Sequence, residues 1–127
     1  MIGYVTVGVS DMQKACAFYD ALFGELGGKQ LFGQDRIKFY GTGADQPMVA
    51  VCIPYDQQAA HHGNGNMLAL PVKRDDIGRI YAKALELGAT DDGEPGNRNP
   101  VFYGAYVRDP DGNKICFYEM NLQLIAK

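Results

Sequence analysis

Two adjacent histidines are the residues of this chain best suited to bind a metal ion or to transfer protons. His61 and His62 are the only histidines among its 127 residues. Adjacent residues of an extended segment point to opposite sides, so the two imidazoles cannot easily bind one ion. Gly63 and Gly65 follow closely. We therefore interpret the pair as part of a solvated linker rather than as a relocated metal or acid–base site.

Carboxylate pairs and cysteines supply the other reactive groups. Residues 75–76 and 91–92 are aspartate pairs, and they stand where a helix start and a loop are expected, two places that aspartate favours. The cysteines are Cys16, Cys52 and Cys116, none in a CxxC pair, which predicts buried side chains in a reducing compartment rather than disulfides. Neither a nucleophile elbow nor a nucleotide-binding glycine loop is present, so the sequence assigns no catalytic residue.

Composition and charge exclude several function classes. Hydrophobic residues make up 46% of the chain and charged residues 21%, as in globular proteins, and the length suits one domain. The formal net charge of −3 argues against nucleic acid as a partner, because phosphates need a basic surface. No apolar run has the length of a membrane span, and the first residues lack the features of a signal peptide. We expect a cytoplasmic protein that binds neither nucleic acid nor membranes.

The N-terminal half predicts a strand, a helix and three further strands. Its first residues alternate, with valines on one side, as in a half-buried strand. Apolar residues then recur at the spacing of a helix face, and a pair of glycines follows. The predicted segments are a strand over residues 2–9, a helix that Ser10 or Asp11 caps and Gly27 ends, and strands over residues 29–33, 36–40 and 48–53.

The C-terminal half repeats this order. A shift of 63 positions aligns Tyr4 with Met67 and Val7 with Leu70. The same positions are apolar in both halves after this shift, although few residues are identical. The segment DPDGN has the composition of a hairpin turn. The predicted segments are a strand over residues 67–72, a helix from Asp75 that stops at Gly88, a loop with room for a short irregular strand over residues 91–100, and hairpin strands over residues 103–108 and 114–118. We expect a single domain, with an N-terminal module (1–55), a linker (56–66) and a C-terminal module (67–127).

Several segments, in this order and spacing, resemble the glyoxalase/bleomycin-resistance/dioxygenase superfamily, also called the vicinal oxygen chelate superfamily. Residues 7–12 (VGVSDM) and 17–19 (AFY) are similar to its opening strand and helix. Residues 65–70 (GNMLAL) stand where its second half usually opens, and residues 87–90 (LGAT) resemble the end of its second helix. Residues 103–113 (YGAYVRDPDGN) resemble its C-terminal hairpin and are the most specific of these segments.

The resemblance implies an α+β fold in which two βαβββ modules form a curved mixed sheet that holds a ligand on its concave side. It also implies a homodimer, because many members pair and an open sheet leaves strand edges to cover. Many members bind a divalent metal through His, Glu or Gln, but the matched positions here are Tyr4, Met67 and Cys116. Phenol, thioether and thiol are poor ligands for such an ion, so we expect no metal cofactor. A Cu(I) site at Cys52, Met67 and Cys116 is disfavoured, since Met and Cys are ordinary core residues.

The faces of the expected strands predict which side chains line the pocket. If the valines of the first strand pack against the helix, Tyr4 and Thr6 point to the other side, and the same rule applies to later strands. The resulting lining is aromatic, soft and partly polar, which suits a planar or apolar organic molecule. The predicted ligand-binding residues are Tyr4, Thr6, Arg36, Lys38, Tyr40, Met67, Ala69, Cys116 and Tyr118.

Two functions stay open at this point. The favoured one is a protein of the bleomycin-resistance type, which holds a small organic molecule without metal or chemistry, because the missing ligands remove the Lewis acid. The alternative is a metal-dependent lyase, isomerase or dioxygenase of the same superfamily with atypical ligands. A register shift of one residue would bring Gln46 or Asp56 toward the site and favour this alternative.

Overall fold

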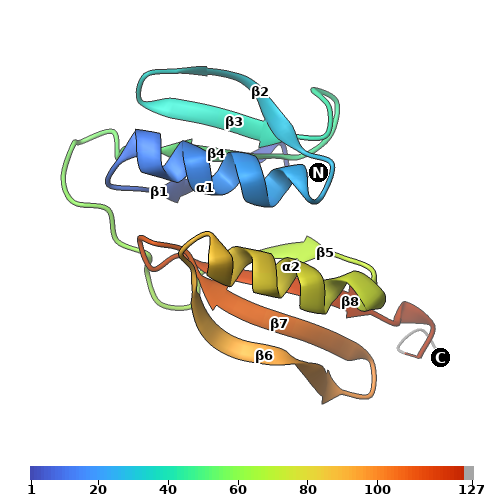
Figure 1. Cartoon of the computed structure of the whole chain (residues 1–127). Coiled ribbons are helices and arrows are strands. Elements are labelled where there is room, and N and C mark those ends of the chain that lie inside the picture. The colour runs from blue at the N-terminus through green and yellow to red at the C-terminus, as the bar shows by residue number, and fades with distance from the viewer. Residues whose placement is uncertain (125–127) are drawn as a thin grey trace. The chain divides into compact units, whose positions relative to one another are not determined.

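Residues 1–124 are described by a computed structural model of the chain (Figure 1). The order strand, helix and three strands occurs twice, which confirms the predicted pair of βαβββ modules. The first module contains β1 (Tyr4–Gly8), α1 (Met12–Gly24), β2 (Lys29–Gln34), β3 (Ile37–Gly41) and β4 (Met48–Cys52). The second contains β5 (Leu68–Pro71), α2 (Arg74–Glu86), β6 (Thr90–Asn99), β7 (Phe102–Arg108) and β8 (Lys114–Met120), and a short 3₁₀-helix, η1 (Leu122–Leu124), follows.

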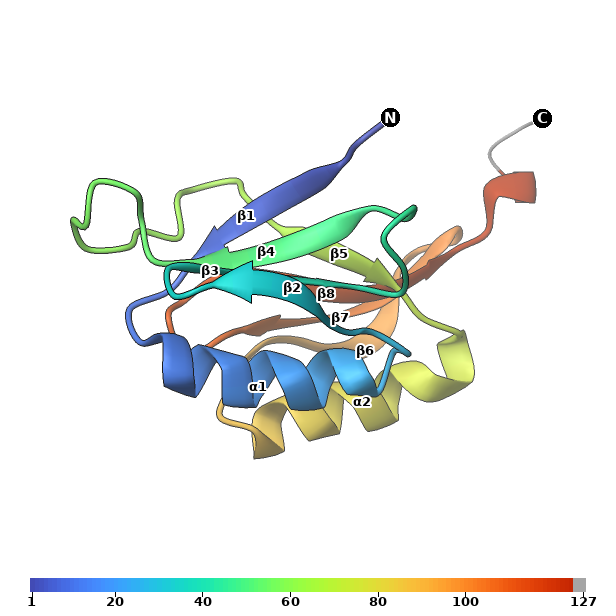
Figure 2. The same ribbon diagram turned by 90° about the horizontal axis from the view of Figure 1, so that it is seen from above.

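Each module builds a four-stranded mixed sheet with its helix on one face (Figures 1 and 2). The N-terminal sheet has the order β1-β4-β3-β2, in which β1 is parallel to β4 and the other pairs are antiparallel. The C-terminal sheet has the corresponding order β5-β8-β7-β6, with β5 parallel to β8. The two sheets therefore share one topology, as the shift of 63 positions predicts.

The start and end of α1 follow from local chemistry. The side chain of Asp11 accepts a hydrogen bond from the backbone N–H of Lys14 at 3.1 Å, so Asp11 rather than Ser10 is the cap. After Gly24 the chain turns, and the N–H groups of Leu26 and Gly28 both donate to the carbonyl of Phe23, at 2.9 and 2.8 Å. Gly27 has φ 80°, a left-handed conformation that glycine adopts without a steric penalty.

The core of each module lies between its sheet and its helix. In the N-terminal module α1 buries apolar and aromatic side chains against Val51 and Tyr40 of the sheet. In the C-terminal module α2 buries Ile77, Ile80 and Ala84, and Phe117 is fully buried in the central strand β8. The buried residues of α1 are Ala15, Phe18, Tyr19, Leu22 and Phe23.

Residues 91–100 differ most from the sequence prediction, because β6 is a strand of ten residues rather than a loop. Its pairing with β7 shifts register three times, and one shift leaves Glu94 and Pro95 without partners between Gly93 and Gly96. Proline has no N–H to donate, so it is tolerated in an edge strand at such an interruption. Glycine and proline therefore mark bulges in a strand here, where the composition alone suggested a loop.

The chain divides into two compact units, Met1–Gly63 and Asn64–Lys127, and the division falls inside the segment predicted as a linker. Neither α1 nor α2, nor any other helix within residues 1–124, has the length and apolar character needed to cross a membrane.

Candidate functional site

The sheet face opposite α2 gathers the side chains most suited to hold a ligand in the C-terminal module. Alternate residues of a strand point to opposite faces, and Ile115 and Phe117 of β8 are buried in the core with α2. Cys116 and Tyr118 therefore point to the opposite face, which we call the face opposite α2. Ala69 is in register with Cys116, so these three residues, all predicted as ligand-binding, share this face.

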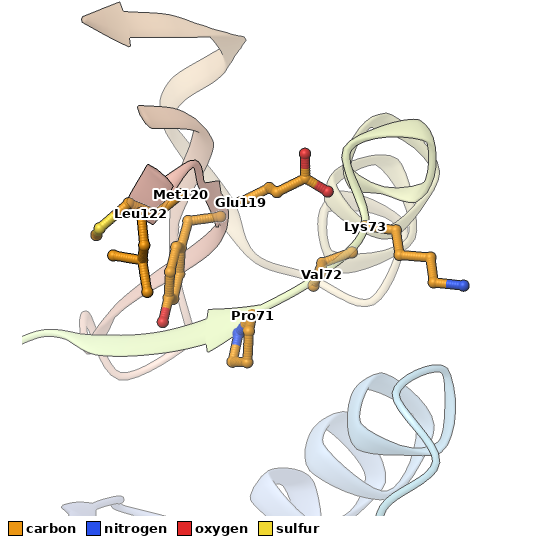
Figure 3. Close-up of a pocket in the computed structure, with 7 residues that line it drawn as sticks. Pro71, Val72, Lys73, Glu119, Met120 and Leu122 are labelled. Carbon is orange, nitrogen blue, oxygen red and sulfur yellow. The ribbon is translucent and has the colours of Figure 1, made fainter. Parts of the chain in front are cut away.

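A groove of about 450 Å³ opens at one end of this face. Its size falls in the range of pockets that bind small organic molecules. Met120 and Leu122 lie together on one side, and Lys73 extends away from them (Figure 3). The residues that line the groove are Pro71, Val72, Lys73, Tyr118, Glu119, Met120 and Leu122.

Tyr118 makes one wall of this groove aromatic. Its ring stacks on Phe102 of β7, with ring centroids 5.4 Å apart and an angle of 7° between the ring planes. The side chain of Tyr118 is only partly buried, so it remains accessible to a ligand. The groove thus combines a fixed aromatic surface with the flexible side chains of Met120 and Leu122, a combination that adapts to apolar molecules.

Charged side chains surround Tyr106 further along the same face. The guanidinium of Arg98 lies 5.1 Å from the centre of the Tyr106 ring, and the ammonium of Lys114 lies 5.0 Å from it. Arg108 and Lys114 both pair with the carboxylate of Asp92, at 3.2 and 3.4 Å. Tyr106 is in register with Cys116 on the neighbouring strand. We call Arg98, Arg108 and Lys114 the cation cluster.

The N-terminal module carries an aromatic surface on the face opposite α1. Tyr4 packs edge to face on Phe39 with centroids 4.9 Å apart, and Phe39 stacks on Phe32 at 4.5 Å. These rings lie on three different strands, and Ala50 of β4 is in register with both Thr6 and Phe39. Tyr4 and Phe32 are each 52% exposed, which leaves ring surface available for contact with a planar molecule.

The structure corrects the predicted placement of β3 side chains. Tyr40 points to α1 instead of sharing the face of Tyr4, and its hydroxyl donates to Asp20 at 2.7 Å. Burial, together with Cys16 and Asp20 beside it, raises the pKa of Tyr40. Lys38 alternates with Phe39 and so lies on the α1 side as well. The prediction was wrong because β3 has aromatic residues on both faces, so hydrophobicity could not distinguish them.

Two further residues complete the comparison with the predicted site. Arg36 precedes β3; its guanidinium donates to the carbonyl of Ile53 at 2.9 Å and lies 5.3 Å from the ring of Tyr55. Met67 precedes β5 and is 46% exposed. The sequence did not predict Phe32, Phe39, Met120 or Leu122 as site residues. The alternation that places Tyr4 on one face would include Phe39 once β3 is aligned with β1 through β4.

The model of the glyoxalase/bleomycin resistance protein/dioxygenase superfamily matches residues 1–117. The chain belongs to this superfamily. A solved glyoxalase/bleomycin resistance protein from Albidiferax ferrireducens T118 is 36% identical to it, with a TM-score of 0.85 over 95% of this chain and 99% of that protein. Among curated proteins, none matches.

Two further solved structures share the fold. A hypothetical protein from S. aureus is 25% identical, with a TM-score of 0.74 over 94% of this chain and 92% of its own. The fosfomycin resistance protein FosX from Mesorhizobium loti is 18% identical, with a TM-score of 0.73 over 100% of this chain and 97% of its own, a likeness that shows the fold alone.

The residues at the superfamily's metal positions do not fit a divalent ion. The ring of Tyr4 packs on Phe39, and Met67 is a thioether outside any strand. Cys116 is fully buried, and burial raises the pKa of its thiol, so the thiol stays protonated at neutral pH. Within residues 1–124, no three His, Cys, Asp or Glu side chains gather at a spacing that would hold a metal ion.

The cysteines should differ in their reactivity toward iodoacetamide. Burial raises the pKa of Cys52 and of Cys116, so their thiolates form only at higher pH, whereas Cys16 is more exposed. We expect alkylation of the native protein to label Cys16 first and labelling of the other two to increase as the pH rises. Peptide mass spectrometry would measure each site, with urea-unfolded protein as the control in which all three react. Native labelling of Cys116 as fast as Cys16 would contradict the burial that we describe.

Proposed function

We propose that the chain binds a small organic molecule in the groove beside Tyr118, without a divalent metal. The observation that carries this proposal is the groove itself, which has a volume of about 450 Å³ and opens at one end of the face opposite α2. Tyr118 was predicted as ligand-binding from the alternation of β8, and it lines this groove. Membership of a superfamily with small-molecule-binding members supports the proposal but does not identify the ligand.

The chemistry of the groove favours a ligand with an apolar body. Pro71, Met120 and Leu122 offer aliphatic and thioether surface, and Met120 and Leu122 are exposed to solvent. Covering this surface with an apolar molecule is favourable, at about 25 cal/mol for each Å² removed from water. The ring of Tyr118, held in place by its stack on Phe102, adds a flat surface for an aromatic group.

The absence of a metal is proposed from the donor groups. Tyr4, Met67 and Cys116 supply a phenol, a thioether and a buried thiol whose pKa is raised, none of which suits Zn, Ni, Mn or Fe in the divalent state. We expect elemental analysis of mildly purified protein to find far less than one metal ion for each chain. A nearly stoichiometric amount of any of these metals would overturn this part of the proposal and favour the enzyme alternative.

The groove is tested with a neutral probe, 4-phenylbutan-1-ol, followed by NMR titration of the full chain. We expect the largest shift changes at the backbone amides of Val72, Tyr118 and Met120. Replacing Tyr118 by Ala removes the aromatic wall, so Tyr118→Ala should weaken binding about tenfold, which corresponds to about 1.4 kcal/mol.

Tyr55→Ala provides the matched control for this measurement. Tyr55 is 87% exposed and belongs to the other unit of the chain, so its removal should leave the affinity for the probe unchanged. Shift changes confined to other regions, or equal affinities of the wild-type and Tyr118→Ala proteins, would show that the groove is not the binding site.

A further inference from the structure

We propose that the ligand of this groove carries an anionic group, such as a carboxylate, and that the cation cluster binds it through Arg98. This inference rests on the proposed function, because it names the chemical class of the molecule that the groove holds. It is carried by the positions of Arg98, Lys114 and Tyr106, by the local balance of charge, and by the register that connects this cluster to Tyr118.

The glycines of β6 leave room for the guanidinium of Arg98 beside the ring of Tyr106. Gly93 is in register with Tyr106, and Gly96 with Gly104. A Cβ atom at either glycine would stand 3.1 Å from a guanidinium nitrogen of Arg98, so the guanidinium lies directly over both positions. Arg98 is exposed, and one of its donors goes to the carbonyl of Glu94. A guanidinium has five N–H donors, which leaves several to bind an anion.

The charges around Tyr106 are not balanced. The cation cluster contributes three positive charges, and Asp92 is shared between Arg108 and Lys114. Of the other two acidic side chains of β6, Asp91 accepts from the hydroxyl of Tyr81 on α2 at 2.9 Å, and Glu94 adds one further negative charge, so positive charges still outnumber negative ones. Net positive charge therefore remains beside Tyr106, although the chain as a whole has a formal charge of −3. An anion bound there would restore the local balance.

The register places the cationic and apolar ends of this face next to each other. Cys116 is opposite Tyr106, and Tyr118 is opposite Gly104. Tyr106 and Tyr118 are therefore separated by two residues along the hairpin of β7 and β8. Two residues of an extended strand span about 7 Å. A molecule with an apolar body beside Tyr118 and a carboxylate a few bonds away can therefore reach Arg98, and this arrangement favours anionic over neutral ligands.

The test compares two probes of the same size, 4-phenylbutanoate and 4-phenylbutan-1-ol, in NMR titrations of the full chain. We expect the carboxylate to bind about tenfold more tightly than the alcohol at low ionic strength. This preference should decrease between about 20 mM and about 300 mM salt, because exposed charges are screened. Arg98→Gln should remove most of the preference and leave the affinity for the alcohol unchanged, and Arg98→Lys should restore part of it.

Arg79→Gln is the matched control, since Arg79 lies on α2 and pairs with Asp76. It should leave both affinities and the ratio between them unchanged. Equal affinities for the two probes in the wild-type protein, or a preference for the carboxylate that persists in Arg98→Gln, would overturn the inference. Binding of both probes in the groove would still support the proposed function. Failure of both probes to bind would overturn the inference and the proposed function together.

Discussion

Replacing Phe117 by Ala should lower the free energy of unfolding of the C-terminal module by about 3–5 kcal/mol, the range for large aromatic side chains in protein cores. Phe117 has no exposed surface, and it is in register with Leu70 on one side and Ala105 on the other, in the strand at the centre of the core. The cavity left by its ring cannot close without moving strands on both sides. Urea unfolding of the full chain, followed by circular dichroism, would measure the change.

Phe32→Ala is the matched control for this substitution. Phe32 is 52% exposed and stacks only on one side, against Phe39, so its loss should cost about 1 kcal/mol. Native-state hydrogen exchange would locate each effect, and for Phe117→Ala the loss of protection should be largest in β5, β7, β8 and α2. A cost for Phe117→Ala as small as that for Phe32→Ala would show that Phe117 is not in the core as described.

The second large effect is expected at Asp109, where β7 turns into β8. Asp109 is only 3% exposed, and its carboxylate accepts from the N–H of Asp111 at 2.9 Å and from the backbone and side-chain nitrogens of Asn113 at 2.8 and 2.9 Å. Asp109→Ala removes the acceptor for all three donors, and hydrogen bonds to a charged group are worth more than neutral ones. We expect a loss of about 2–4 kcal/mol in urea unfolding.

Two comparisons separate the role of this carboxylate from that of any turn aspartate. Asp109→Asn keeps one oxygen acceptor and should recover part of the stability, whereas Asp35→Ala, in the exposed turn between β2 and β3, should change it by less than about 0.5 kcal/mol. If Asp35→Ala and Asp109→Ala lowered the free energy of unfolding equally, the hydrogen bonds of the Asp109 carboxylate would add no stability beyond that of an ordinary turn residue.

The sequence predicts those parts of the fold in which a few neighbouring residues determine the local structure. Apolar periodicity fixes the faces of β1 and α1, and a single side-chain oxygen at Asp11 fixes where α1 begins. The DPDGN segment predicts its hairpin because Pro and Asp-Gly restrict the backbone. The two-module architecture follows from repetition of these signals, and the superfamily match agrees with it.

The candidate site was harder to predict because its residues depend on pairing between strands. Tyr40 and Phe39 are both aromatic, and only the register with β4 shows that Phe39 shares the face of Tyr4 whereas Tyr40 contacts α1. Arg98 stood in a segment that composition assigned to a loop, so its place over Tyr106 could not be foreseen. Met120 lines the groove because β8 continues past Tyr118, and Leu122 lines it from η1, which follows β8.

The interrupted pairing of β6 has a consequence for the behaviour of the chain at high concentration. An edge strand with a continuous row of free N–H and C=O groups is a template for adding strands from other molecules, which leads to aggregation. Pro95 breaks this row by lacking an N–H, and the register shifts around Gly93 and Gly96 bend the strand away from a flat edge. The edge at β6 is therefore protected against fibril-like growth by the same bulges that give Arg98 its position.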